Sequence, residues 1–228
     1  MALAVVLGML VPATLVLSAF VTANPASVRL DPVHPTLNVP LQVVSLVSYA
    51  GAVAVLVLLL PWVARRPLAE LGLRAPRASD LAWGAGGALA MIVAATAVGM
   101  LQDSLVHVKA DEVQVEYLRN AHGLALPGYV FIACVAAPFT EELIFRGFVF
   151  NALLRYLPAV LAVPIAGLVF GIAHMQQGNA GAIAPLVAGG IVLTLVYYRS
   201  GSLVASMIAH GLFNLVTVVA VLMFHQTS

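Results

Sequence analysis

The chain has 228 residues, of which 62% are hydrophobic and only 8% charged, and its mean hydropathy is +1.06. Soluble domains are about one quarter charged, so this composition excludes an ordinary water-soluble domain. The net charge of +1 and the lack of any Lys/Arg cluster exclude a nucleic-acid footprint. Apolar runs of about 20 residues, long enough to cross a bilayer, recur along the sequence instead. We therefore expect an integral membrane protein whose surroundings are lipid.

The apolar runs predict an all-α, polytopic helix bundle with about seven transmembrane helices in a single domain, residues 1–228. The first run lacks a basic segment before it, so it is expected to be a retained helix rather than a cleaved signal peptide. A glycine-rich stretch at 84–87 is expected to allow close helix contact. The predicted spans are 3–23, 41–64, 81–101, 128–156, 159–174, 180–198 and 202–224.

Basic residues predict the orientation of the chain, because short loops rich in arginine stay in the cytoplasm. The connector at 65–80 has four arginines, and Arg155 and Arg199 lie in alternate later connectors. The opposite loops, 24–40 and 102–127, hold three basic residues between them. We expect a cytoplasmic N-terminus and an exterior C-terminus. Arginine outnumbers lysine nine to one, which fits a GC-rich bacterial source and hence a bacterial inner membrane.

A few charged or titratable side chains fall inside the predicted helices rather than in the connectors. A charge at the centre of a membrane helix costs on the order of 3 kcal/mol on insertion scales. Several such groups in one small bundle are best explained by pairing with one another, which predicts a polar site inside the bundle. These residues are Glu141, Glu142, Arg146, His174 and His210.

Helical spacing separates the two glutamates. Glu142 and Arg146 are four residues apart, which predicts an ion pair on one face. Glu141 is rotated by about 100° from its neighbour, so it is expected to point elsewhere without that partner. Pro138 and Thr140 suggest that the helix restarts here, with Thr140 as its cap.

Two later helices each bring a histidine together with a second side chain. Phe170 and His174 are four residues apart, and so are His210 and Asn214, so each pair shares a helical face. A glycine follows Phe170 and another follows His210, where a small residue lets a backbone or substrate approach closely. Two histidines, an asparagine and two glutamates on three helices predict a functional site.

The residue types limit the chemistry of that site. The single cysteine, Cys134, lies seven residues before Glu141 in an apolar run and is expected to be a buried hydrophobe. Ser202 and Ser206 lie near the start of the last helix, in no convincing setting for a nucleophile. Water activation remains: a desolvated glutamate is a strong base, and a histidine can orient the water and pass on a proton. Hydrogen-bond donors for an oxyanion contribute about 3–4 kcal/mol each in other hydrolases.

Three short motifs resemble those of a known family. Residues 141–146 (EELIFR) match EExxxR, residues 170–174 (FGIAH) match FxxxH, and residues 210–214 (HGLFN) match HxxxN. These are the motifs, in the same order, of the CPBP family of intramembrane proteases (CAAX protease and bacteriocin-processing). The resemblance implies a membrane endopeptidase similar to type II, glutamate-dependent CaaX prenyl proteases. The motif-bearing catalytic core then spans approximately 128–224.

The resemblance also implies a role for each matching residue. Glu141 would be the base that activates water, and His174 would bind and polarise that water. His210 and Asn214 would form the oxyanion site. The supporting residues would be Glu142 and Arg146, as a structural ion pair, and Phe170. The substrate would be a membrane-associated peptide or protein that carries a lipid in some family members. In a bacterial source, prenylated proteins are not the expected substrate.

Three other interpretations remain open from the residues. Glu141, His174 and His210 could ligate zinc with an open position for water, although no HExxH spacing is present, and we favour a mechanism without a cofactor. A non-catalytic membrane protein that binds a partner, such as an immunity factor, would not need an isolated glutamate near two histidines. Transport or proton relay also uses buried glutamate and histidine, but no inverted repeat is visible. The oligomeric state is not indicated.

Overall fold

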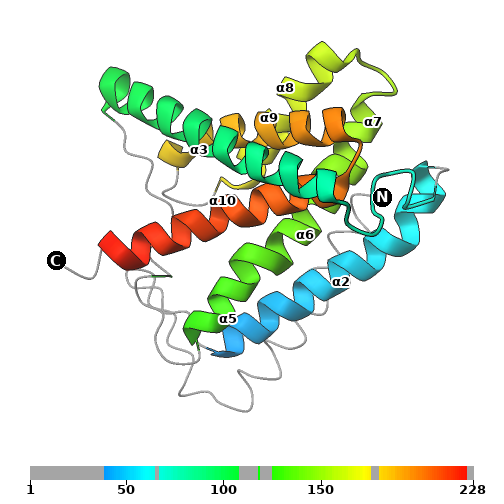
Figure 1. Ribbon diagram of the computed structural model, residues 1–228, viewed down its shortest axis with the longest axis horizontal. Coiled ribbons are helices and arrows are strands. Elements are labelled where there is room, and N and C mark those ends of the chain that lie inside the picture. The colour runs from blue at the N-terminus through cyan, green and yellow to red at the C-terminus, as the bar shows by residue number, and fades with distance from the viewer. Residues whose placement is uncertain (1–38, 65–66, 108–117, 119–124, 176–179, 225–228) are drawn as a thin grey trace.

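The computed structural model of the protein describes residues 39–64, 67–107, 118, 125–175 and 180–224, and every element in these ranges is helical. Figure 1 shows long helices that cross one another, with short connections at their ends. The elements are α2 (Val39–Ala64), α3 (Ala78–Val106), α5 (Ala125–Phe131), η1 (Ile132–Ala136), α6 (Ala137–Glu142), η2 (Leu143–Phe150), α7 (Asn151–Leu153), α8 (Ala159–Ala173), η3 (Ala180–Ala182), α9 (Ile183–Ser200) and α10 (Leu203–Phe224).

The helices confirm an all-α membrane protein. In the described part of the chain, four helical stretches are long and apolar enough to span a bilayer: Ala78–Val106, Ala125–Leu153, Ile183–Ser200 and Leu203–Met223. Two shorter apolar stretches, within α2 and α8, coincide with two more of the predicted spans. The predicted first span at 3–23 lies outside the described residues. Six of the seven predicted spans therefore correspond to helices.

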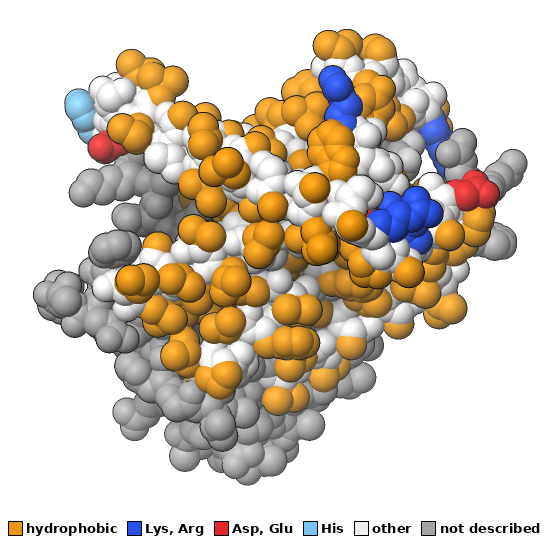
Figure 2. Space-filling view, in the orientation of Figure 1, with side chains coloured by type: hydrophobic (Ala, Val, Ile, Leu, Met, Phe, Trp, Pro, Cys, Tyr) orange, Lys and Arg blue, Asp and Glu red, His pale blue; other side chains and the backbone are white. Residues whose placement is uncertain are grey.

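The surface of the protein is apolar, as expected for a protein surrounded by lipid. Large hydrophobic side chains are exposed along the outward faces of the helices, among them Leu58, Leu89, Met100 and Val160. Figure 2 shows hydrophobic side chains over most of the visible face, with the few charged side chains towards its edges. Lipid is as apolar as these side chains, so the hydrophobic effect does not drive the helices together within the bilayer. Packing and polar contacts between helices must therefore hold the bundle together.

Close packing of helices depends on glycine at several crossings. The stretch at 84–87 lies against α9 and α10: a Cβ on Gly84 would meet the side chain of Ile208 at 2.4 Å, and one on Gly87 would meet Val196 at 2.7 Å. A Cβ on Gly171 would lie 3.0 Å from the backbone nitrogen of Val187 on α9. The predicted close contact at 84–87 is therefore confirmed, and α3, α9 and α10 form one packed group (Figure 1).

The connector between α2 and α3 is tied to the turn between α9 and α10. Gly72 has a positive φ of 87°, and its carbonyl oxygen accepts a hydrogen bond of 3.1 Å from the backbone nitrogen of Leu203. A Cβ on Gly72 would meet the carbonyl oxygen of Gly201 at 2.6 Å. The hydroxyl of Tyr197 donates to the carbonyl of Leu71. These contacts set the position of α10, which carries part of the polar site.

A bidentate ion pair fixes the start of α3. The guanidinium of Arg74 contacts both carboxylate oxygens of Asp80, at 2.7 and 3.0 Å. Hydrogen bonding to Asp80 raises the pKa of Arg74 above its ordinary value. The Asp80 carboxylate also accepts from the backbone nitrogen of Arg77, at 2.8 Å, which satisfies an otherwise unpaired N–H in the first turn.

The helix that carries the first motif is continuous, so the predicted restart at Pro138 is wrong. The residues that flank α6 keep helical dihedrals, and the hydroxyl of Thr140 donates to the carbonyl of Ala136 instead of capping an N-terminus. Two π-helical stretches, η1 and η2, flank α6. In η1 the backbone N–H of Ala137 bonds to the carbonyl of Ile132, five residues back. Pro138 has no N–H, so the wider turn accommodates it without a break in direction.

Candidate active site

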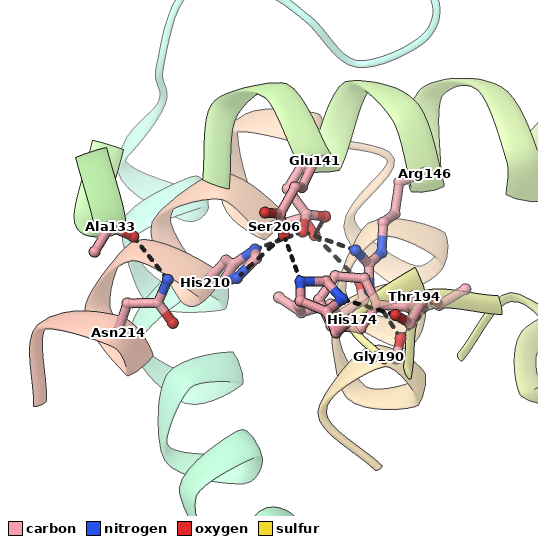
Figure 3. Close-up of polar contacts among 12 residues, drawn as sticks. Ala133, Glu141, Arg146, His174, Gly190, Thr194, Ser206, His210 and Asn214 are labelled. Atoms are coloured by element: carbon pink, nitrogen blue, oxygen red, sulfur yellow. Dashed lines mark hydrogen bonds and ion pairs between the residues drawn. The ribbon is translucent and has the colours of Figure 1, made fainter. Parts of the chain in front are cut away.

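The structure brings the intramembrane polar residues of three helices to one place. Glu141 and Glu142 end α6, and Arg146 lies on η2 of the same continuous helix. His174 follows the last residue of α8, and His210 lies in the middle of α10. Figure 3 shows the side chains of Glu141, His174 and His210 pointing toward one another, with Arg146 close by. The charges predicted to share one site do so.

Glu142 is the most heavily bonded side chain of the cluster. Its carboxylate is completely buried. Oε1 accepts from Arg146 Nη1 at 2.8 Å and contacts His210 Nδ1 at 3.0 Å. Oε2 accepts from the hydroxyl of Ser206. A buried carboxylate with three such partners is satisfied electrostatically and is closed to solvent.

Arg146 is held by contacts from its own helix and from two others, although its Nε has no hydrogen-bond partner among the described residues. Besides its ion pair with Glu142, Nη2 donates to the carbonyl of Gly190 on α9 at 2.9 Å. The hydroxyl of Thr194 donates to the same carbonyl, at 2.7 Å. The guanidinium carbon lies 4.7 Å from the centre of the Phe170 ring, a cation–π contact. This buried arginine therefore joins the motif helix to α8 and α9.

Glu141 has a different environment, although it is the next residue. Its Oε2 lies 3.3 Å from Nε2 of His174 and 3.9 Å from Nε2 of His210. Among the described residues that oxygen has no hydrogen-bond partner of good geometry. The Glu141 side chain keeps 19% of its surface exposed and that of His174 keeps 20%, whereas those of Glu142 and Arg146 keep none. Parts of the Glu141 and His174 side chains therefore reach the surface, whereas the Glu142–Arg146 pair and the Oε2 atom of Glu141 are buried.

The backbone sets which nitrogen of His174 carries a proton. Nδ1 lies 2.7 Å from the carbonyl oxygen of Phe170, and a carbonyl can only accept, so Nδ1 must donate. Nε2 then faces Glu141 as a lone pair when the ring is neutral. Two acceptors 3.3 Å apart repel unless they share a proton or a water beside them donates to both. The pair is thus arranged to hold a water or to share a proton.

Phe170 packs against both histidines. Its ring centre lies 4.4 Å from that of His174 and 5.8 Å from that of His210. Phe145 packs edge-on against it at 5.0 Å. Phe170 is itself only 2% exposed, so its ring restricts the rotation of both imidazoles and covers Arg146.

Asn214 lies apart from the carboxylates. Its Nδ2 donates to the carbonyl of Ala133 in η1, at 2.7 Å, as Figure 3 shows. No contact between Asn214 and Glu141 is present among the described residues. The partner of the Ala133 carbonyl in π geometry would be the N–H of residue 138, which is a proline. Asn214 therefore supplies the missing donor, and its second N–H and its Oδ1 remain for other partners.

Sequence reasoning considered Ser206 only as a nucleophile and missed its contact with Glu142. The sequence contains a signal for it, because Ser206, His210 and Asn214 follow one another at intervals of four and form one polar face of α10. The hydrogen bond from Arg146 to the Gly190 carbonyl, which also accepts from the Thr194 hydroxyl, left no such signal. A backbone carbonyl on another helix has no sequence pattern.

The donor set was tested as a metal site. Within the described ranges, no group of three or more His, Cys, Asp or Glu side chains is arranged to hold a metal ion. The residues named for a zinc alternative, Glu141, His174 and His210, lie together but do not form such a group. We therefore derive no step through a metal.

Comparisons with known proteins agree with the motifs. Residues 123–216 match the family model described as type II CAAX prenyl endopeptidase Rce1-like. A protein of Mycoplasma capricolum subsp. capricolum, described as uncharacterized, is 28% identical over 95 residues, which are 41% of this chain and 27% of that protein. The chain thus aligns with about a quarter of that relative. No solved structure matches the chain. The matched residues include all three motifs and the whole cluster around Glu141, so this part of the chain is similar to type II CAAX prenyl endopeptidases.

Proposed function

We propose that this protein is an intramembrane endopeptidase that hydrolyses a peptide bond with water activated by Glu141. The observation that carries the proposal is the contrast between the two glutamates. The buried charge of Arg146 is neutralised by Glu142. Glu141 is left partly exposed, with an unbonded oxygen directed at two histidines. A structural role does not require such an arrangement, and a general base does.

In the proposed reaction, a water binds beside the pair and contacts both Glu141 and Nε2 of His174. Glu141 takes one proton from it as the water oxygen attacks the carbonyl carbon of the scissile bond. The C–O bond forms and the carbonyl π electrons move to oxygen. The oxyanion then accepts hydrogen bonds from His210 and Asn214, the polar residues on the neighbouring face of α10. As the tetrahedral intermediate collapses, the C–N bond breaks, and the proton passes through Glu141 or His174 to the leaving amine.

The substrate is proposed to be a membrane-associated or lipidated peptide or protein. The site lies between apolar helices, and the face of the protein seen in Figure 2 is largely hydrophobic, so a substrate delivered by the bilayer would reach it most directly. To test whether the protein recognises a lipid on its substrate, the cleavage rates of matched peptides with and without the lipid are compared.

The first test uses Glu141→Gln, which keeps the shape of the side chain and removes its basicity. The purified variant should lose at least about a thousandfold in kcat on any peptide that the wild type cleaves, while it elutes and unfolds as the wild type does. Because it still binds, the same variant can trap substrates, which are then identified by proteomics against wild type. Cleavage at the wild-type rate, or a full cellular phenotype in Glu141→Gln, would contradict hydrolysis and favour a binding role.

The metal-free mechanism has a separate test. Metal content of the purified protein is measured, and activity is followed during treatment with a strong chelator. We expect substoichiometric zinc and unchanged activity. Stoichiometric zinc, with activity lost on chelation and regained on zinc addition, would replace this mechanism with the zinc-dependent alternative.

A further inference from the structure

Ser206 is a buried hydroxyl that the proposed reaction does not use. It lies on α10, one turn before His210, and is 0% exposed. Its hydroxyl contacts Oε2 of Glu142 and lies 3.3 Å from the carbonyl oxygen of Leu193. A hydroxyl has one proton to donate, and the closer, charged acceptor is the carboxylate. Ser206 thus connects to the active site through Glu142.

The protonation state of Glu142 follows from its surroundings. Arg146 is fully buried, and the carboxylate of Glu142 lies 2.8 Å from its Nη1. A guanidinium does not release its proton in a protein, so a buried one requires a carboxylate in ionised form beside it. Glu142 is therefore an acceptor on both oxygens, with Oε1 directed at Arg146 and His210 and Oε2 directed at Ser206.

An acceptor at this position determines the form of His210. Its Nδ1 lies 3.0 Å from Oε1 of Glu142, so Nδ1 must carry a proton. Nε2 points toward Oε2 of Glu141, 3.9 Å away. In a neutral ring of this form Nε2 is an acceptor, and it can donate to an oxyanion only when it carries a second proton.

We propose that Ser206 is a positioning residue: its hydroxyl orients the Glu142 carboxylate, which holds His210 with a proton on Nδ1 and with Nε2 directed at Glu141. Without the Ser206 hydroxyl, Oε2 loses a donor, and the carboxylate can rotate toward Arg146 and away from Nδ1. His210 then loses the partner that selects its form. The effect on catalysis rests on the proposed function, whereas the effect on the ring of His210 does not.

The test therefore measures the ring and the activity separately. The full chain is labelled with ¹⁵N-histidine in nanodiscs, and the His210 signals, one set among six histidines, are assigned with His210→Gln. In wild type we expect the signature of a protonated Nδ1. In Ser206→Ala this signature should change to a mixture of forms, and kcat should fall about tenfold with little change in KM. Ser206→Thr, which keeps the hydroxyl, should restore both.

Thr217→Val is the matched control, because the Thr217 hydroxyl lies on the same helix and donates only to the carbonyl of Phe213 among the described partners. It should change neither the His210 signals nor kcat. If Ser206→Ala does not fold, Ser206→Cys, with a weak donor of similar size, is measured instead. Unchanged His210 signals in a folded variant would overturn the proposal. Changed signals in a protein whose wild type cleaves nothing would uphold the positioning role and contradict the proposed function.

Discussion

Two adjacent glutamates occupy this site, and the helix turn of about 100° between them gives them different partners. Glu142 points into the protein and is bonded to Arg146, Ser206 and His210. Glu141 points to the partly exposed side, where Nε2 of His174 lies 3.3 Å away. A charge without a direct cationic neighbour is costly inside a bundle. That cost falls on Glu141, the residue proposed above as the general base.

This difference predicts opposite consequences for two substitutions. Glu142→Ala removes the only described carboxylate that pairs directly with the buried Arg146, and should lower the free energy of unfolding by about 3–5 kcal/mol. Glu141→Gln should change it by less than about 1 kcal/mol. The measurement is denaturant unfolding in detergent, with folded yield as a second readout. Equal destabilisation by both substitutions would show that the division of roles is wrong.

The position of Asn214 predicts a kinetic effect. If one N–H of its amide donates to Ala133 and the other to the oxyanion, Asn214→Ala should lower kcat about 10²–10³-fold. Asn214→Asp keeps the size of the side chain but has no N–H, so it should be at least as inactive. A steady-state comparison with Thr217→Val, on the same helix, tests this. Wild-type kcat in Asn214→Ala would remove this residue from the oxyanion site.

At the level of the helices, the site depends on the wide π turns of the motif helix and on the close approach of α10 to one of them. The π turn of η1 contains the carbonyl groups of Ala133 and Cys134, and α10 approaches them directly. A Cβ on Gly211 would lie 2.5 Å from the Cys134 carbonyl oxygen. Asn151 makes a similar contribution at the end of η2, where its Nδ2 donates to the Arg146 carbonyl at 2.7 Å. Asparagine amides thus satisfy carbonyls in or beside both wide turns.

The close contact at Gly211 can be tested by comparing the stability of an alanine substitution there with that of a matched substitution at Gly86. Gly211→Ala must push η1 and α10 apart, so it should reduce stability by about 1–3 kcal/mol and lower activity by moving Asn214. Gly86→Ala, on α3, meets nothing within 4 Å and should be neutral or stabilise by up to about 1 kcal/mol. Thermal unfolding in detergent compares them. A Gly211→Ala protein as stable as Gly86→Ala would contradict the close contact.

Over the whole molecule, the position of a polar group depends on how far it lies from the helix ends. The buried ion pair, Glu141 and two histidines lie between helices, while the other charged side chains of the described residues lie in connectors or near helix ends, and the face seen in Figure 2 is largely apolar. The arginine-rich connector before α3 and the acidic loop after it lie at opposite ends of that helix, which is 29 residues long and sufficient to cross a bilayer. The orientation of the whole chain can therefore be tested at the two ends of α3.

Single cysteines at these ends test the predicted orientation. In a Cys134→Ala background, Ser104→Cys should react with a membrane-impermeant maleimide in intact cells. Arg77→Cys should react only after permeabilisation, because arginine-rich loops stay cytoplasmic. Both positions are exposed, so unequal burial does not explain a difference. The reverse labelling pattern would place the N-terminus outside.

The amino-acid sequence by itself determined the class of protein, six of the described helices and the grouping of Glu141, Glu142, Arg146, His174 and His210. These features follow from apolar length and from the helical period, which are local properties. The tertiary structure alone decided that His210 bridges the two glutamates, that Ser206 binds Glu142 from 64 residues away, and that Asn214 supplies a donor to Ala133, 81 residues away. It also replaced the predicted helix restart by π turns. The physical reason is that such contacts depend on how helices cross and on which backbone carbonyls remain free, and neither is encoded in the spacing of residues along one helix.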